Sequence, residues 1–599
     1  MRDRRADLPR RAWLAGIATG MAGTAGCVGR FQRAAERDEL EQVSIEVLTV
    51  PEDADPHALR IANHLAGNME DAGMAVHVQP TRMQTLLRDV LINRDFDMYV
   101  WRHPGQFDPD TLRPLLHSRF SEEPGWQNPF GYSSVTVDEL VDEQRRAPNG
   151  RKAVIEEFHE AFFEEYPFIP IAFEAENRLL RRDRIETNED IAITNPLWPA
   201  SLRPLELPEE EGEELEVRLG MIDLRATRNL NPISVDYRGP DHLTELIYDP
   251  LFQRVGSEFH PWLAVKSEWV SREDAQAPSI EVTLREGAQW HDGEPITAAD
   301  VTFTMALYAD TTVTDDDPTL PAPRFRGRSS LVESTEAVND RKVRMQFIET
   351  SRQVAQRALT VPILPRHVWK EYTDLAEIAG IEIAGQTTDA MIIDNTDPVG
   401  SGLYEVEEVT EDVRIRLVRN NDHFVGEPAD NDTFGRDLYL GEFDVIEIEL
   451  RPSVRNVAES IREGELDGCM TNLGADLVNE MTTNAAPLSQ YRTQTTRLFH
   501  VGFNLRTSPF TSHRFRRGIG GMLDREYLQK EVFEGSAMLT ASPLVNTDYV
   551  SEEYRWPTDR DVGFVGEAGE GEIDAEAARE LFREAGFSYS EGGELLAQR

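Results

Sequence analysis

The first strong pattern of apolar and polar positions covers residues 44–80. SIEVLTV (44–50) alternates with the two-residue period of a strand, and AVHVQP (75–80) does so again. Between them, residues 57–73 place apolar side chains on one helical face and end at a glycine. The segment therefore predicts a strand, a helix and a second strand, which is a βαβ unit.

The same two periods recur along the rest of the chain. FDMYVW (96–101) predicts an apolar strand, and residues 151–167 predict a long helix followed by the strand FIPIAFE (168–174). Strands and helices alternate from residue 213 to about residue 500, and 574–587 predict an amphipathic helix. This alternation is typical of an α/β protein.

A clear local pattern lies at QWHDGEPITAADV, residues 289–301. Asp292-Gly293 is a turn pair, because glycine reaches positive φ without steric cost. Thr297 can cap the following helix, and Asp300 can reach back to it as in a capping box. His291 beside Asp292 could act as a base, but its place in a turn favours a structural role.

Length and charge narrow the class of protein. A chain of 599 residues exceeds the size of a single core, so two or three domains are expected. The formal charge is -46, and only five of the 62 basic residues are lysines. A surface this acidic repels itself in dilute salt, which favours a protein of a high-salt environment. No basic stripe is present for a nucleic acid.

The start of the chain predicts an export signal. RRAWLAGIATGMAGTAGC (10–27) has paired arginines, a short apolar run and small residues before Cys27. It resembles a twin-arginine signal with a lipoprotein cleavage box, which implies a lipid on Cys27 and a polar tether over 28–43. The alternative is a buried N-terminal helix. Cys469 then has no disulfide partner and is expected to be a small buried filler.

Residues of the types used in catalytic and metal sites are present, but they lack the spacing of known catalytic or metal-binding motifs. The sequence has no HExxH, GxSxG, Walker loop or GxGxxG motif, so neither a catalytic centre nor a cofactor is predicted. His159 lies near Glu156 and Glu160 but lacks a second histidine at metal-ligand spacing. The acidic run 315–317 lacks the spaced ligands of a calcium loop, which favours a solvated loop.

Four stretches form a set of motifs: 279–304 (SIEVTLREGAQWHDGEPITAADVTFT), 397–406 (DPVGSGLYEV), 503–510 (FNLRTSPF) and 514–528 (RFRRGIGGMLDREYL). In sequence and in order they resemble motifs of the family 5 extracellular solute-binding proteins, which serve ABC importers of peptides, nickel and related solutes. The resemblance implies a type II periplasmic-binding-protein fold, α/β, with two lobes and an extra domain. It also implies a binding protein rather than an enzyme.

The order of the segments departs from that family. Residues 44–203 resemble the family's C-terminal quarter, which includes part of the third lobe and the closing segment of the first lobe. Residues 217–495 then resemble the first lobe with the inserted extra domain, and 496–599 the remainder of the third lobe. Residues 204–216 (PLELPEEEGEELE) link the two parts. A circular permutation explains this order; a rearranged gene or an unrelated N-terminal extension is the alternative.

The resemblance also indicates where a solute would bind. Trp101 stands at the family's cleft tryptophan, but His103-Pro104 occupy the place where an aspartate is usual for binding a peptide amino terminus. Asp108 lies farther on, in a turn. The other candidates for ligand contact are Tyr248, Tyr404, Asn504 and Arg516.

These observations predict a monomeric, lipid-anchored protein on the extracellular face of the membrane. It would bind a peptide or another organic solute by lobe closure and deliver it to the permease subunits of an ABC importer. Its membrane contact would come through the lipid alone. A secreted hydrolase with a similar bilobed shell, or a sensory binding module without a transporter, would fit the same features.

Overall fold

The computed structural model describes residues 41–597, apart from 53, 106–107, 148, 189, 207–213, 234–242, 271–275, 315–318, 379–380, 383–386, 427–438, 483–486 and 545–546. The predicted signal and Cys27, most of the tether, the centre of the linker and the acidic run at 315–317 lie outside the described residues. No helix in the described part of the chain is both long and apolar enough to cross a membrane.

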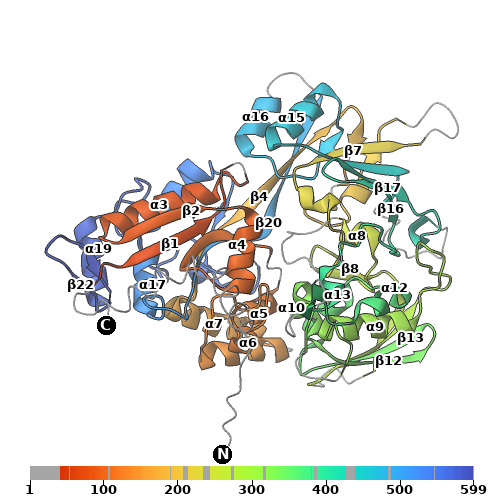
Figure 1. Ribbon diagram of the computed structural model, residues 1–599, viewed down its shortest axis with the longest axis horizontal. Coiled ribbons are helices and arrows are strands. Elements are labelled where there is room, and N and C mark those ends of the chain that lie inside the picture. The colour runs from red at the N-terminus through yellow and green to blue at the C-terminus, as the bar shows by residue number, and fades with distance from the viewer. Residues whose placement is uncertain are drawn as a thin grey trace, which may run out of the picture.

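One large mixed sheet runs through the molecule (Figure 1). Half of it has the order β2-β1-β3-β20-β4, in which β1 pairs in parallel with β2 and β3, and β20 is antiparallel to both β3 and β4. These strands are β1 (Ser44–Thr49), β2 (Ala75–Pro80), β3 (Met98–His103), β4 (Phe168–Arg181) and β20 (Leu488–Phe503), and the short β21 (Met538–Leu539) pairs with β4.

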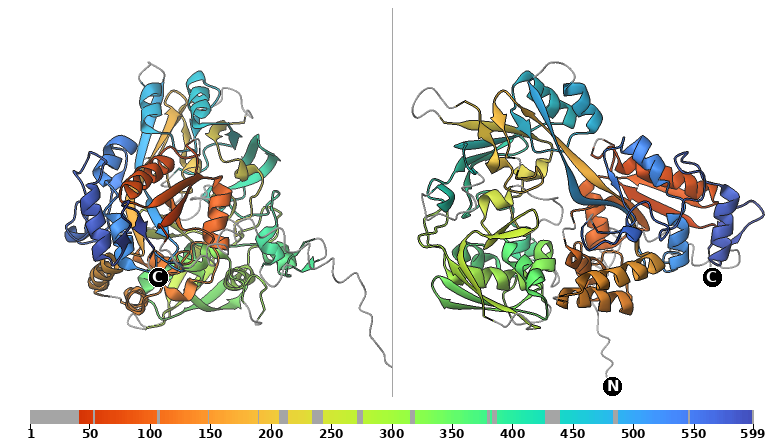
Figure 2. Two further views of the ribbon diagram at one scale, coloured as in Figure 1. Left: turned by 60° about the vertical axis from the view of Figure 1, so that its left-hand side comes forward. Right: turned by 180° about the vertical axis from the view of Figure 1, so that it is seen from behind.

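The other half of the sheet continues from β4 in the order β19-β7-β18-β17-β16. Strand β7 is parallel to β18 and β19, and β17 is antiparallel to both its neighbours. The strands are β7 (Glu216–Met221), β16 (Tyr404–Thr410), β17 (Arg414–Arg419), β18 (Val445–Leu450) and β19 (Gly468–Cys469). The long strands β4 and β20 therefore carry the sheet from one half into the other, as the view from behind shows (Figure 2).

A separate four-stranded antiparallel sheet lies beside this large sheet, with the order β10-β11-β13-β12. Its strands are β10 (Ala264–Trp269), β11 (Ser279–Leu284), β12 (Val332–Asn339) and β13 (Lys342–Phe347). Helix α9 (Ala298–Ala309) begins with the predicted capping box, in which Thr297 and Asp300 satisfy each other's backbone N–H groups. The turn and helix start predicted at 289–301 are confirmed.

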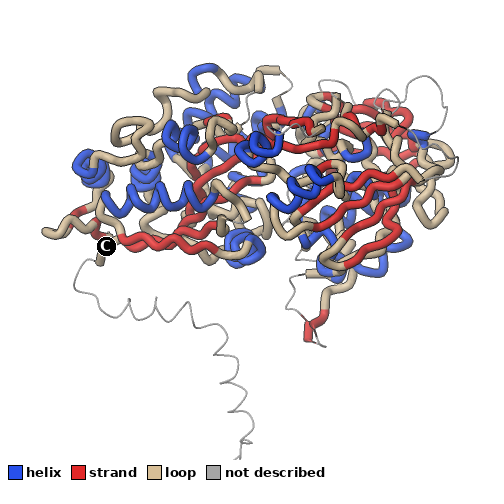
Figure 3. The backbone as a smooth tube through the Cα atoms, turned by 90° about the horizontal axis from the view of Figure 1, so that it is seen from above, coloured by secondary structure: helices blue, strands red, loops and turns tan. Residues whose placement is uncertain are grey.

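Helices cover the sheets on several sides, so strands and helices are mixed throughout the molecule (Figure 3). The helices are α3 (Ala58–Asp71), α4 (Met83–Arg88), α5 (Leu112–Leu116), α6 (Val135–Arg146), α7 (Arg151–Glu165), α8 (Thr244–Ile247), α10 (Arg326–Ser329), α11 (Arg352–Ala355), α12 (Arg366–Trp369), α13 (Asp389–Ile392), α15 (Val454–Glu463), α16 (Ala475–Thr482), α17 (His513–Gly520), α18 (Arg525–Tyr527) and α19 (Ala575–Glu584). The remaining strands form two-stranded pairs: β5 (Ile185–Glu186) with β6 (Arg203–Pro204), β8 (Phe252–Val255) with β9 (Glu258–Pro261), β14 (Glu377–Ile378) with β15 (Ile381–Glu382), and β22 (Ser588–Tyr589) with β23 (Leu595–Leu596).

The predicted α/β class is confirmed. The predicted βαβ unit is β1, α3 and β2, and the predicted helices at 151–167 and 574–587 are α7 and α19. Strand β3 extends two residues beyond the predicted end at Trp101. Arg102 and His103 pair with Phe499 and Leu498 of β20, which prolongs the strand. The sequence around residue 101 does not show that β20 is its antiparallel partner.

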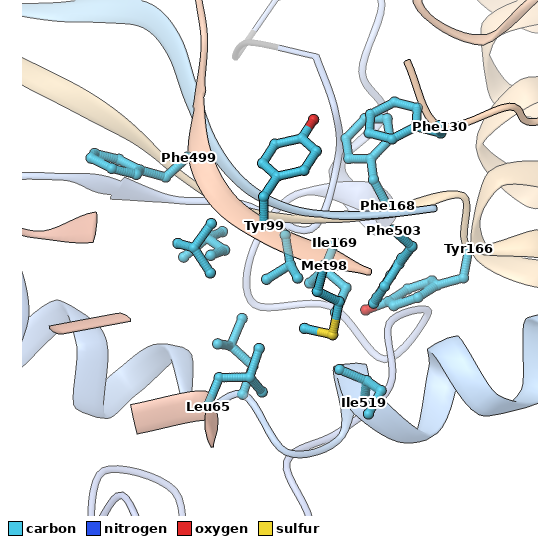
Figure 4. Packing of buried hydrophobic residues seen from close by; sticks show 14 of the residues in the cluster. Leu65, Met98, Tyr99, Phe130, Tyr166, Phe168, Ile169, Phe499, Phe503 and Ile519 are labelled. Atoms are coloured by element: carbon cyan, nitrogen blue, oxygen red, sulfur yellow. The ribbon is translucent and has the colours of Figure 1, made fainter. Parts of the chain in front are cut away.

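Three main hydrophobic clusters define the bodies of the molecule. We use the names of the expected domains for these bodies: third lobe for the one whose cluster spans 43–173 and 498–595, extra domain for the one at 233–390, and first lobe for the one that combines 180–246 and 403–470 with Trp262. In the third lobe, Leu65 and Met98 pack in one core with Phe503 and Ile519 (Figure 4). A smaller cluster joins α15 and α16 to the sheet.

Candidate functional site

Strands β4 and β20 pass between the first and third lobes, and their ladder is interrupted at the crossing. The register shifts between Gln494 and Leu498, where strand-to-strand bonding cannot continue regularly. Side chains take over there: the Gln494 amide donates to the Phe173 carbonyl at 2.6 Å, and the Thr495 hydroxyl donates to the Glu174 carbonyl at 2.8 Å. The backbone carbonyls of the crossing are thus bonded without a regular ladder.

A buried charge network surrounds this crossing. Arg102 donates to Glu174 at 2.6 Å and lies 3.0 Å from Asp55. Asn472 also donates to Glu174, at 2.7 Å. Burial alone would raise the pKa of Glu174, but Arg102 and Arg497 hold that pKa below its ordinary value. The crossing therefore contains ionised groups that are buried from water, and each of them is stabilised by the opposite charge of its partner.

Glu176 lies two residues farther along β4 and contacts two arginines. Arg178 donates to it at 2.6 Å, and Arg497 of β20 forms a short ion pair with its other oxygen. The Arg178 guanidinium also lies over the Trp198 ring of the first lobe, with its central carbon 4.4 Å from the ring centroid. Groups of both lobes thus meet at this point of the crossing.

The first two predicted ligand contacts, Trp101 and Asp108, lie within β3 and beyond its end. Trp101 is largely buried and carries the Arg102 guanidinium 4.8 Å from its ring centroid. Asp108 accepts from Arg151 at 2.9 Å and from the Asp110 backbone N–H at 2.8 Å. Burial would raise the pKa of Asp108, but its bond to Arg151 lowers that pKa. Asp108 thus begins a 3₁₀ turn and pairs with an arginine of its own lobe.

The two tyrosines among the candidates are fully buried in different clusters. The Tyr248 hydroxyl accepts from the Asn395 amide at 3.0 Å, and the Tyr404 hydroxyl donates to the Phe443 carbonyl at 2.8 Å. Burial raises the pKa of both phenols. Each hydroxyl has a protein partner, and each ring belongs to a core.

Asn504 and Arg516 both bond to backbone carbonyls of the third lobe. The Asn504 amide donates to the Phe96 carbonyl at 2.9 Å. Arg516 donates to the carbonyls of Tyr166 at 2.8 Å and Phe510 at 2.6 Å. Burial lowers the pKa of Arg516 to about 10. The six predicted contacts therefore do not gather at one place in the described structure, and their role in ligand binding stays a prediction.

The histidines singled out in the sequence have structural partners. His159 bonds to the Ile155 carbonyl at 2.7 Å and to the Ser542 hydroxyl at 2.8 Å. His291 bonds to the Gly402 carbonyl at 3.0 Å, and its neighbour Asp292 pairs with His367 at 2.7 Å. Within the described residues, no group of three or more histidine, cysteine or acidic side chains could hold a metal.

Two cavities of the described structure are lined by different residues. One of about 650 Å³ lies between α7 and α17 and is lined by Glu160, Phe163, His513, Arg517 and others. The other, of about 880 Å³, lies beside α9 and α12 in the extra domain. None of the six predicted contacts lines either cavity.

The charge network at the crossing was not predicted from the sequence. A signal was present, because Glu174, Glu176 and Arg178 lie in a strand with many apolar residues, and ionisable groups in a buried strand need partners. Their partners Asp55, Arg102 and Arg497 come from distant segments, so the sequence could not pair them.

Comparisons with known proteins give one family. The model for bacterial extracellular solute-binding proteins, family 5 Middle, matches residues 258–598. A peptidoglycan-binding protein of Agrobacterium fabrum is 25% identical over 332 residues, covering 50% of this chain and 46% of the relative. An oligopeptide-binding protein of Bacillus subtilis is 22% identical over 323 residues, covering 53% and 50%. The chain thus spans about half the length of the curated relatives it matches.

Solved structures are similar over a larger share of the chain. The oligopeptide-binding protein of Bacillus subtilis in complex with a nonapeptide has a TM-score of 0.43 at 18% identity, covering 63% of this chain and 66% of that one. A Campylobacter jejuni protein in complex with Ni(L-His) has a TM-score of 0.42 at 15% identity, covering 64% and 65%.

Proposed function

We propose, from the premise that this chain belongs to the bacterial extracellular solute-binding proteins of family 5, that it binds a peptide or a similar organic solute and presents it to an ABC importer. In this proposal the solute binds between the first and third lobes, near the crossing of β4 and β20. No bond of the solute changes, because the protein acts through its affinity for the solute and through its conformation.

The observation that carries the proposal is the connection between the lobes. The first and third lobes have separate hydrophobic clusters, and the long strands β4 and β20 join them. Bodies with their own cores and few strand connections can rotate as units, with the change confined to the connecting residues. The irregular register between Gln494 and Leu498 supplies such a place.

The class of solute is proposed from the end of β3. His103 is buried, its Nδ1 accepts from the Gly105 backbone N–H at 3.2 Å, and burial lowers its pKa to about 3. The carboxylates near the crossing, Asp55 and Glu174, are both paired with Arg102. A peptide amino terminus would compete with Arg102 for these carboxylates, so we include solutes without an amino group among those to be tested.

Location and anchoring are also part of the proposal. Residues 10–27 support export by a twin-arginine signal and a lipid on Cys27, which would hold the protein on the extracellular face of the membrane. The family is described as extracellular, which agrees with this location. Radiolabelled lipid precursor and a Cys27→Ser variant test the anchor: the label should be lost with the cysteine, and retention of the label would contradict it.

The binding function is tested by a thermal-shift panel in high salt. Peptides of several lengths, free amino acids, small organic acids and oligosaccharides are added to the full chain. A true ligand raises the unfolding temperature by mass action, with about 2.7 kcal/mol of stabilisation at a hundredfold excess over Kd. Compounds that give a shift are then checked for breakdown by mass spectrometry. A panel without any shift, or one in which the solute is consumed, would contradict the proposal.

A further inference from the structure

We propose that Asp110 of the third lobe and Arg357 of the extra domain form a latch that sets how far the third lobe closes. Both are positioning residues, since neither needs to touch the solute. The inference rests on the proposed function in one respect only, namely that the third lobe moves relative to the other bodies. It assigns part of the closing energy to the extra domain rather than to the solute.

Asp110 is built as an acceptor within its own lobe. It follows β3 in the short 3₁₀ helix Pro109–Thr111 and is completely buried. Arg145 of α6 donates to its two oxygens at 2.7 and 2.9 Å, and Gln144 donates at 3.1 Å. This carboxylate is therefore already paired and oriented by residues that move with it.

Arg357 adds a second guanidinium from the other body. It lies in the 3₁₀ helix Gln356–Thr360 of the extra domain and donates to Asp110 Oδ2 at 2.5 Å. Breaking a buried ion pair is costly when it leaves a charge without a partner in a dry site. When the third lobe separates from the extra domain, Asp110 keeps its ion pair with Arg145, and Arg357 becomes hydrated. The contact is strong enough to orient the bodies, and its loss strands no charge.

Other contacts across the same seam are mostly polar. Arg326 binds Glu123 through two bonds of 2.7 and 2.8 Å, and the Gln127 amide donates to the Pro323 carbonyl at 3.0 Å. The Ser351 backbone N–H donates to the Arg145 carbonyl at 2.9 Å. Such groups can exchange protein partners for water, so a polar seam is suited to opening and closing.

The apolar packing shows which bodies are joined to each other. The clusters of the third lobe and the extra domain have no residue in common. In contrast, Val406 and Phe424 pack against both the extra domain and the first lobe. The extra domain thus shares apolar contacts with the first lobe, whereas the third lobe meets the extra domain mainly through ion pairs and hydrogen bonds.

The test measures the distance between the two bodies in the full chain, without added solute. Spin labels are placed on cysteines at two exposed positions, Glu70 of α3 and Ser334 of β12, in a Cys27→Ser background. Pulsed electron paramagnetic resonance then gives the distribution of distances between the two labels in high salt. We expect Arg357→Gln to lower the ratio of the short to the long distance about tenfold, as loss of one charge-assisted contact does.

Control variants separate the latch from general effects of charge. Arg344→Gln removes an exposed ion pair with Glu281 inside the extra domain, at 2.7 Å, and should leave the distribution unchanged. Arg357→Lys keeps the charge and should restore part of the short distance. Asp110→Asn should act as Arg357→Gln does; if it fails to fold because Arg145 loses its partner, Arg357→Gln still decides.

The latch is overturned if Arg357→Gln leaves the distance distribution unchanged. It is also overturned if Arg344→Gln shifts the distribution as much as Arg357→Gln does. These outcomes are independent of the solute panel. If Arg357→Gln shifts the distribution while no compound binds, the latch stands and the proposed function falls. If a compound binds and Arg357→Gln changes nothing, the proposed function stands and the latch falls.

Discussion

The backbone N–H of Val43 donates to the carbonyl of Leu595 at 2.7 Å, although the two residues are separated by nearly the whole described chain. The neighbouring Ala597 N–H donates to the Glu41 carbonyl at 2.8 Å. Segments before β1 and after α19 thus lie side by side in the third lobe, where α3, β1, α19 and β22 are seen together (Figure 1). This adjacency supports the proposed circular permutation, since the segments that a permutation separates were continuous in the parent fold and must still lie close together.

The shared third lobe predicts that this lobe does not fold from either part of the chain alone. Residues 44–203 alone lack β20, the antiparallel partner of both β3 and β4. We expect this fragment to show no cooperative urea transition by circular dichroism, and a mixture with 213–599 to regain one. As the control, a chain opened within 207–213 and joined from 597 to 41 should fold cooperatively. Cooperative unfolding of each fragment alone would contradict a shared lobe.

Arg516 is expected to stabilise the third lobe. It bonds to the carbonyls of Tyr166, Phe510 and Glu165 near the end of α7. Arg516→Met keeps much of the volume but leaves these carbonyls without their donor, so we expect a loss of about 3 kcal/mol in the free energy of unfolding.

The urea midpoint of Arg516→Met measures this loss. Arg514→Met, at an exposed position of the same helix, is the matched control and should change stability little. If Arg516→Met is as stable as the parent protein but binds the identified solute more weakly, the residue contacts solute and the structural explanation is wrong.

Because His159 is buried, we expect the free energy of unfolding to fall in acid. Burial lowers its pKa from 6.5 to about 4, so the folded protein keeps the ring neutral while the unfolded chain binds a proton near pH 6.5. Its contribution is complete above pH 6.5 and is lost as the pH falls toward 4. The full change is on the order of 3 kcal/mol.

Urea titrations between pH 7 and pH 4 test this contribution. His159→Gln should flatten the fall in stability over this range, although His64 and His500, whose pKa is also lowered by burial, still contribute in the variant. His77→Gln, at an exposed position of β2, is the control. A variant of His159 that keeps the full acid slope would show that this histidine is not responsible.

The acidic surface predicts that salt stabilises the protein. At a formal charge of -46, self-repulsion opposes the compact state, and screening shortens its range from about 10 Å at 0.1 M salt to about 3 Å at 1 M. We expect the free energy of unfolding to rise by a few kcal/mol over that interval, as measured by urea midpoints in potassium chloride. Sucrose at matched osmolality controls for solvent exclusion. Stability that is constant or falls with salt would contradict the prediction.

Local sequence patterns were sufficient to predict several secondary-structure elements and the family. Two-residue and helical periods predicted β1, α3, β2, α7 and α19 because their core faces are encoded by neighbouring residues. The capping box at Thr297 and Asp300 is local in the same sense. The family was visible because its motifs are short contiguous stretches, and the match over 258–598 confirms it.

Which distant side chains meet could be learned from the folded molecule alone. Arg102, Glu174 and Arg497 come from three strands, and Arg357 reaches Asp110 from another body. Tyr404 and Arg516 were sensible candidates by residue type, yet the fold buries each against backbone carbonyls. The two kinds of information differ in how far apart in the sequence the residues lie. A period of two or 3.6 residues shows which face of a segment is buried, because it depends on neighbouring residues. The partner of a buried charge can come from any segment that the fold brings within a few ångströms.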